Sequence, residues 1–251
     1  MLKNYFDLIR VPQWIKNLFV FVPLLFSMHL FESDYFLISL KGFFVFCLAS
    51  SFIYIINDIV DLEADANHPK KKNRPLPSGR ISKNNAMILS AVILIILVAL
   101  TFTTNRSFNY FLLGFVVLNI LYSFYFKHIV ILDVFSIAAG FSIRVLAGAA
   151  IISVPISDWL ILTTMFISLF LGVMKRHSEL IQVSDSTTAS TRKVLTDYSV
   201  TFTNQMATVA AAGVVICYAL YTVAPRTVSV FGTENLIYTT PFVVFGIFRY
   251  M

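Results

Sequence analysis

The sequence predicts an all-α protein, a polytopic bundle of transmembrane helices. Of its 251 residues, 58% are hydrophobic and only 13% are charged, whereas a soluble domain carries about a quarter charged residues. Apolar runs of roughly 18 or more residues, long enough to cross a bilayer, recur from one end of the sequence to the other. We therefore expect a single membrane-embedded domain over residues 1–251 and no soluble globular core.

The opening segment, residues 1–16, is expected to form an amphipathic helix at the membrane surface. Charged residues are spread along it, and Pro12 interrupts it. No short apolar run ending in a small-residue cleavage site follows, so the segment does not have the pattern of a cleavable signal peptide.

Eight apolar segments follow and are interpreted as membrane spans. They cover approximately residues 17–31, 36–57, 85–104, 108–126, 130–152, 157–174 and 202–224, and an eighth begins near residue 237. Because Phe242–Met251 carries no terminating signal, we expect that the C-terminal end of the natural protein is missing from this sequence.

Lys and Arg are distributed unequally between the two sides of the predicted bundle. Most of them, with the N-terminus and both long polar loops, fall on one side, whereas the other side carries only Lys41, Arg106 and Arg226. The basic side of a membrane protein faces the cytoplasm. We therefore expect a multi-pass protein of the inner (cytoplasmic) membrane with its chemistry on the cytoplasmic side. The net charge of +6 is explained by this topology, and no nucleic-acid partner is expected.

An Asp-rich segment ends the second predicted span. At 100° per residue, Asp61, Asp65 and Asp58 lie about 40°, 80° and 100° from Asn57 around a helix, and Glu63 lies on the other side at about 240°. Carboxylates on one face repel one another unless a cation lies among them, and hard oxygen ligands suit Mg²⁺. We predict a Mg²⁺ site made of Asn57, Asp58, Asp61 and Asp65, with the three Asp residues catalytic. The alternative, a solvated loop of acids and bases, fits less well at the end of an apolar span.

A basic stretch, Lys70–Arg80, follows the acidic face. Membrane topology explains the sign of its charge but not the sequence NRPLPSG at Asn73–Gly79, where prolines and a glycine fix the backbone. A fixed loop that carries Lys71 and Arg74 beside a carboxylate–Mg²⁺ site is suited to clamp a phosphate group.

The spacing Asn57-x3-Asp61-x3-Asp65, followed by NRPLPSG, resembles the first Asp-rich motif of the UbiA-type intramembrane prenyltransferases. The resemblance covers essentially the whole chain. It implies about nine transmembrane helices around a central cavity, of which about eight are present here, and a Mg²⁺ ion that binds a diphosphate.

The second Asp-rich motif of that family is altered in this sequence. In its place after the sixth span stand Lys175, Arg176 and Glu179, which leaves one acid and adds two cations. The change argues against an ordinary two-metal prenyl-diphosphate site and suits a substrate with more phosphate groups. The alternative is a surface ion pair between Lys175 and Glu179, four residues apart on a helix.

Four further segments are similar to one branch of the family, the decaprenyl-phosphate phosphoribosyltransferases. They are Arg10–Ser27, Tyr122–Ala149, Lys175–Leu180 and Arg192–Ser199. This resemblance implies that phosphoribose is transferred from phosphoribosyl pyrophosphate to a polyprenyl phosphate, with release of pyrophosphate, for a cell-envelope precursor.

Several basic residues gain a predicted role mainly from this resemblance. Arg144, halfway along the fifth span, is expected either to contact a phosphate or to pair with Asp133 or Asp158. Lys127 could equally be a snorkelling residue at a helix end. The full predicted substrate-binding set is Asn57, Lys71, Arg74, Lys127, Arg144, Lys175, Arg176, Glu179, Arg192 and Lys193.

Two other functions stay open on the sequence. A prenyltransferase could attach a polyprenyl chain from its diphosphate to an aromatic acceptor of the quinone or haem type. A membrane transporter would also bury ionisable groups, but it would more typically show inverted repeats, and we find no convincing internal repeat. The sequence does not decide whether the chain forms homo-oligomers.

Overall fold

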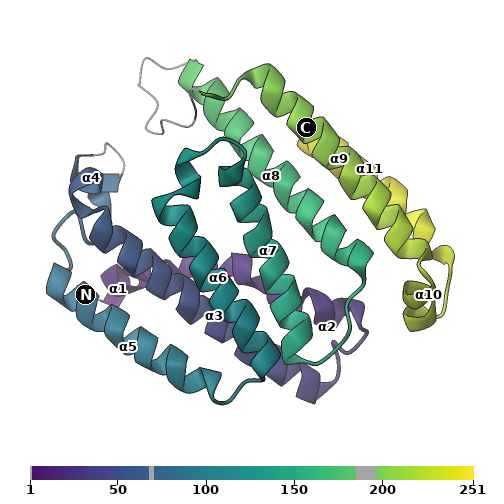
Figure 1. The fold of residues 1–251 in the computed structure, drawn as a ribbon, viewed down its shortest axis with the longest axis horizontal. Helices are drawn as coiled ribbons and strands as arrows, with labels where there is room; N and C mark the ends of the chain where they lie inside the picture. The colour runs from purple at the N-terminus through teal and green to yellow at the C-terminus, as the bar shows by residue number, and fades with distance from the viewer. Residues whose placement is uncertain (1, 68–70, 185–194, 196) are drawn as a thin grey trace.

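The computed structural model describes residues 2–67, 71–184, 195 and 197–251, and these are helical or loop, without strands (Figure 1). The α-helices are α1 (Leu2–Leu8), α2 (Val22–Phe26), α3 (Ser33–Val60), α4 (Leu62–Ala66), α5 (Lys83–Thr101), α6 (Arg106–Phe124), α7 (Leu132–Ile151), α8 (Asp158–Ser184), α9 (Val200–Val223), α10 (Pro225–Phe231) and α11 (Thr240–Tyr250). The 3-10 segments are η1 (Val11–Phe21), η2 (Lys71–Asn73), η3 (Phe126–His128) and η5 (Asn235–Thr239).

Six helices in the described part of the chain are long and apolar enough to cross a membrane, namely α3, α5, α6, α7, α8 and α9. They confirm the predicted fold class and coincide with six of the eight predicted spans. Three of them begin at a short polar side chain that caps the first turn: Ser82 accepts from the Asn85 amide, Asn105 from that of Phe108, and Ser199 from that of Phe202.

The first and last predicted spans are shorter than a bilayer requires. Residues 17–31 were predicted as one span, but the chain there continues η1 into α2, which ends at Phe26, and Pro12 and Pro23 lie at the starts of these two segments. Proline lacks the amide hydrogen that a continuous helix needs, which explains the division. At the other end, α11 has 11 residues.

The opening segment is divided at Arg10. The structure has α1 up to Leu8, a left-handed residue at Arg10 with φ of 54°, and then η1. The interfacial helix predicted over residues 1–16 is therefore two helical pieces joined by a turn. Its position relative to a membrane stays a prediction.

The η1–α2 segment packs into the bundle between α3 and α7. Close approach is possible because α7 presents Gly148, where an added Cβ would lie 2.1 Å from the carbonyl oxygen of Val20. Val20 and Leu24 join a fully buried apolar cluster with Phe46 and Phe108. This packing fixes the segment along the bundle, with Arg10, Gln13 and Lys16 near the end that carries the acidic motif.

Candidate active site

A cavity of about 510 Å³ lies among η1, α3, α6, α7 and α8 at the end of the bundle that carries the acidic motif. Five cationic residues and no Asp or Glu line it among the described residues: Arg10, Lys16, Arg144, Lys175 and Arg176. An adjoining hollow of about 400 Å³ shares Arg10 and Gln13 with the cavity and reaches Asp58, Arg74 and Arg80. The site therefore has one part that contains carboxylates and one part that is purely cationic.

Asp58 and Asp65 converge on the guanidinium group of Arg74. Arg74 Nη1 lies 3.2 Å from Asp58 Oδ1 and 2.6 Å from Asp65 Oδ2. Arg10 Nη2 also donates to Asp58 at 2.5 Å, and Lys71 Nζ lies 2.9 Å from Asp65 Oδ1. Both carboxyl side chains are 2% exposed. Burial without these partners would be costly for an ionised carboxylate, so the basic loop and the acidic motif form one unit.

The Asp61 side chain does not join Asp58 and Asp65 at Arg74. Helix α3 ends at Val60, and Asp61 itself adopts φ of −86° and ψ of 10° before α4 begins. Its side chain is 39% exposed and lies 3.8 Å from Lys127 Nζ. Asn57 lines the central cavity. The continuous helix assumed from the sequence ends within the motif, which separates Asp61 from the Asp58–Asp65 pair.

The donor chemistry of this pair fits a magnesium ion that arrives with a polyphosphate. No group of three His, Cys, Asp or Glu side chains in the described parts of the chain lies close enough to hold a metal by itself. Mg²⁺ is usually held by one or two carboxylates and takes its other ligands from water and substrate phosphates. Asp58 and Asp65, two buried carboxylates that share one guanidinium partner, supply that number of carboxylates. The predicted ligand set of four residues stays a prediction.

The NRPLPSG segment forms the fixed loop that the sequence predicted. The Ser78 amide donates to the Arg74 carbonyl at 3.0 Å, and the Ser78 hydroxyl donates to the same oxygen at 2.6 Å. Gly79 has φ of 73°, which glycine adopts without strain. Leu76 is 4% exposed and anchors the loop in an apolar cluster with Leu8 and Ile55. These contacts hold Arg74 toward the two carboxylates.

The altered second motif is a buried ion-pair network. Arg176 Nε donates to Asp133 Oδ2 at 2.8 Å, and Arg176 Nη1 donates to Glu179 at 2.7 Å. The ion pair considered between Lys175 and Glu179 does not form, because Glu179 pairs with Arg176 one residue further on. Arg144 also does not pair with Asp133, whose oxygens are taken by Arg176 and by the Tyr198 hydroxyl at 2.7 Å.

Tyr198 ties the end of the second polar loop to the start of α7. Its hydroxyl donates to Asp133 and accepts from the Ile131 amide at 2.8 Å. Burial, followed by the hydrogen bond to Asp133, raises the pKa of Tyr198, so the phenol stays protonated and keeps donating. Arg192 and Lys193, predicted in the same loop, lie outside the described residues.

Lys16, which was not among the site residues predicted from the sequence, lies in the cationic part of the site. Its side chain is open to the cavity yet surrounded by protein, and burial lowers its pKa, with smaller contributions from the charges of Lys175, Arg144 and Arg10. The signal that could have found it is a lysine at the start of an apolar segment, four residues after Pro12.

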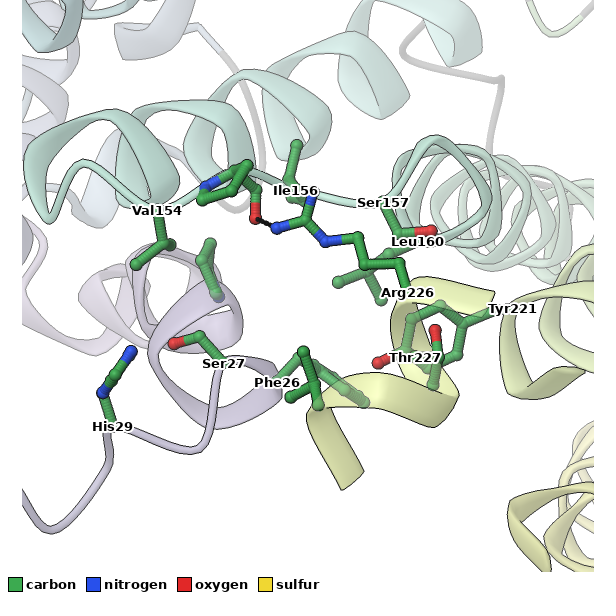
Figure 2. Close-up of a pocket in the computed structure, with 13 residues that line it drawn as sticks. Phe26, Ser27, His29, Val154, Ile156, Ser157, Leu160, Tyr221, Arg226 and Thr227 are labelled. Atoms are coloured by element: carbon green, nitrogen blue, oxygen red, sulfur yellow. Dashed lines mark hydrogen bonds between the residues drawn. The ribbon is translucent and has the colours of Figure 1, made fainter. Parts of the chain in front are cut away.

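A separate pocket of about 150 Å³ lies at the opposite end of the bundle (Figure 2). It is lined by residues that follow α2, α7 and α9, among them Ser27, Val154, Arg226 and Thr227, and Arg226 donates to the Pro155 carbonyl at 2.6 Å. The length of α3, roughly 40 Å, separates that end from Asp58. This pocket is not part of the acidic site.

Comparison with known proteins agrees with this geometry. The sequence pattern of the UbiA prenyltransferase family matches residues 18–251. The chain belongs to this family. Among UbiA relatives, decaprenyl-phosphate phosphoribosyltransferase of Mycolicibacterium smegmatis is 35% identical over 217 residues, or 85% of this chain and 68% of that protein. The enzyme of the same name from Mycobacterium tuberculosis is 31% identical, over 85% of this chain and 72% of that protein.

Solved UbiA structures share the fold. A UbiA homologue from Archaeoglobus fulgidus, bound to GPP and Mg²⁺, matches with a TM-score of 0.74 at 17% identity, over 98% of this chain and 85% of that one. A structure of digeranylgeranylglyceryl phosphate synthase matches with a TM-score of 0.67 at 22% identity, over 100% and 94%. Both resemblances noted in the sequence are confirmed, the one to the UbiA family and the one to its phosphoribosyltransferase branch.

Proposed function

We propose that this UbiA-family chain transfers 5-phosphoribose from phosphoribosyl pyrophosphate to a polyprenyl phosphate of the decaprenyl type. The observation that carries the proposal is the pairing of the buried Asp58 and Asp65 carboxylates, which Arg74 contacts, with an adjoining cavity. Among the residues that the structure describes, every charged residue that lines this cavity is a cation. Two phosphorylated substrates require more positive charge than a prenyl diphosphate and an acceptor without a phosphate group. The relatives named above, at 31–35% identity, support the same reaction.

The reaction breaks the bond between the ribose anomeric carbon and the pyrophosphate oxygen. The pyrophosphate would lie at Asp58 and Asp65, where Arg74 and Lys71 can also contact its oxygens. Magnesium bound there would supply further neutralisation of the leaving group. Positive charge develops on the sugar ring as the bond breaks, and an oxygen of the lipid phosphate forms the new bond to the anomeric carbon.

No general base is required for this step. The attacking phosphate oxygen is already anionic near neutral pH and carries no proton that must be removed. The residues of this chain therefore act by positioning the two substrates and by stabilising charge. We nominate Asp58, Asp61 and Asp65 as the catalytic carboxylates, with Asp58 and Asp65 at the leaving group.

The cavity end is proposed to face the cytoplasm, in the inner membrane. Phosphoribosyl pyrophosphate is water-soluble and would enter past the basic loop, while the lipid tail would lie among the helices. The product is a phosphoribosylated lipid, which suits a later role as a sugar carrier for cell-envelope polysaccharide.

The test uses membranes that contain the protein, polyprenyl phosphate, Mg²⁺ and phosphoribosyl pyrophosphate labelled in the ribose. We expect label in the organic phase, dependent on Mg²⁺ and lost in Asp58→Asn. Transfer of a polyprenyl chain from its diphosphate to an aromatic acceptor, without ribose labelling, would instead identify the chain as a prenyltransferase of the usual type.

A further inference from the structure

The cationic part of the cavity contains three charges that the described residues do not neutralise. Arg10 is paired with Asp58, and Arg176 with Asp133 and Glu179. For Lys16, Lys175 and Arg144, by contrast, the described parts of the chain provide no ion pair with a carboxylate. Like charges gathered in one cavity repel one another, so their presence together indicates a site suited to bind an anion.

Arg144 is held rigidly at the inner end of this group. It is 7% exposed, and its Nε donates to Asn17 Oδ1 at 2.8 Å while Nη1 donates to the Gly140 carbonyl at 2.9 Å. Its guanidinium carbon lies 4.5 Å and 5.3 Å from the ring centres of Phe115 and Phe141. Neutral partners and aromatic faces fix its direction without cancelling its charge.

Lys16 and Lys175 approach the same cavity from η1 and α8 with side chains that remain open to it. The charge of Lys175 acts on Lys16 more strongly than that of any other ionised neighbour. Flexible ammonium groups carried by two different helical segments can close on a phosphate as point charges. The wall beside them is apolar and comes from membrane spans, through Leu118, Phe141 and Leu171.

We propose that Lys16, Lys175 and Arg144 form a metal-free subsite for the phosphate monoester of the acceptor lipid, separate from the Asp58–Asp65 unit that takes the leaving pyrophosphate. This inference rests on the proposed function. The two anions must stand on different sides of the anomeric carbon, since one oxygen arrives as the other leaves. Within the described parts of the chain, the acidic part offers carboxylates for a metal and the cationic part does not, whereas the cationic part adjoins apolar span surface for a lipid tail.

The first experiment measures binding without catalysis. Purified protein is mixed with polyprenyl phosphate or with the matching polyprenol, without phosphoribosyl pyrophosphate, and lipid binding is measured by native mass spectrometry. We expect the wild type to prefer the phosphate, and Lys16→Gln and Lys175→Gln each to lose about tenfold or more of that preference. Lys83→Gln removes the same charge from an exposed position at the same end and should keep it. An unchanged preference in both cavity variants would overturn the subsite.

The second experiment separates acceptor from donor. In the transfer assay, Lys16→Gln should raise KM for polyprenyl phosphate about tenfold and leave KM for phosphoribosyl pyrophosphate nearly unchanged. A rise confined to the donor's KM would assign these lysines to the donor's own phosphate and contradict the proposal. Competition by inorganic phosphate as strong as by the lipid phosphate would show a site for soluble anions, which also contradicts it.

The two proposals can fail separately. If the wild type transfers no phosphoribose but binds lipid phosphate through Lys16 and Lys175, the proposed function falls and the subsite stands. If transfer occurs and neither lysine affects lipid binding or the lipid KM, the function stands and the subsite is wrong.

Discussion

Asp65 contacts a different cation with each of its two carboxylate oxygens. Its side chain is buried, and its two oxygens contact Lys71 and Arg74 separately, at 2.9 Å and 2.6 Å. Because Asp65 pairs with two cations of the basic loop, its carboxylate fixes the loop, and it remains a potential magnesium ligand. Under the proposed function, Asp65 would link the position of the loop to the binding of the leaving group.

Asp65→Asn should reduce phosphoribosyl transfer by about 100-fold or more, because it removes one charge from the leaving-group site while nearly preserving shape. The measurement is the initial rate of ribose label transfer in membranes at saturating Mg²⁺. Glu63→Gln is the matched control, since Glu63 lies two residues away and is exposed. Equal rates in the two variants would remove Asp65 from the catalytic set.

Tyr198→Phe tests the connection between the second polar loop and α7. The change deletes one hydroxyl that donates to Asp133 and accepts from the Ile131 amide. The Ile131 amide and the Oδ1 atom of Asp133 would each lose this partner, while Asp133 Oδ2 keeps Arg176. The loss should cost about 1–3 kcal/mol, seen as a lower Tm in detergent. Tyr125→Phe, at an exposed tyrosine, should leave Tm unchanged, and a similar drop in both variants would contradict the account.

At the scale of residues, the sequence predicted which residues lie near the site better than it predicted where their side chains point. Lys71, Arg74 and Arg176 were predicted to bind substrate and do lie in or beside the two hollows. The carboxylates were placed on one helical face, but the helix ends at Val60, and a helical projection cannot anticipate that. Partners distant in sequence, such as Arg10 with Asp58 and Tyr198 with Asp133, leave no periodic signal.

The packing of α7 against η1 depends on a close approach of their two backbones. An added Cβ at Gly148 would lie 2.1 Å from the Val20 carbonyl oxygen, and backbone cannot move aside as a side chain can. Lys16 is carried on η1 and Arg144 on α7, so this contact sets the distance between two walls of the cavity.

Gly148→Ala should therefore destabilise the protein by about 1–3 kcal/mol through overpacking. Gly114→Ala is the matched control on α6, where nothing lies within 4 Å of the added atom; it should be neutral or stabilising, because alanine is the better helix former by about 1 kcal/mol. Thermal unfolding in detergent compares the two. A Gly148→Ala protein as stable as Gly114→Ala would show that η1 is not held as described.

At the scale of elements, six spans could be predicted because a helix that crosses a membrane needs about twenty consecutive apolar residues, and such runs are visible in the sequence. The first predicted span, residues 17–31, differs in its bounds from the apolar helical segment in the structure, Val11–Phe26. Apolarity alone does not show that Pro12 and Pro23 start two short helical segments that pack between α3 and α7.

In the whole molecule, both parts of the site lie at one end of the bundle. The small pocket near Arg226, drawn in Figure 2, lies at the other end. The charge distribution of the loops predicts that the site end is cytoplasmic. This orientation decides which compartment supplies the sugar donor.

Orientation can be measured with single cysteines, because both native cysteines, Cys47 and Cys217, are buried. Lys83→Cys lies at the site end of α5, and Arg106→Cys at the start of α6 on the opposite end; both positions are exposed. A membrane-impermeant maleimide added to intact cells with a permeable outer envelope should label Arg106→Cys and not Lys83→Cys. The reverse pattern would place the site outside the cytoplasm.

The central claim is that the bond from the anomeric carbon to pyrophosphate breaks and ribose passes to the lipid. The most direct test supplies phosphoribosyl pyrophosphate carrying one label in the ribose and another in its terminal pyrophosphate phosphorus. The account predicts ribose label in the lipid fraction, an equal amount of labelled pyrophosphate released to water, and neither in Asp65→Asn. Pyrophosphate label in the lipid, or no ribose label with a polyprenyl phosphate acceptor present, would contradict it.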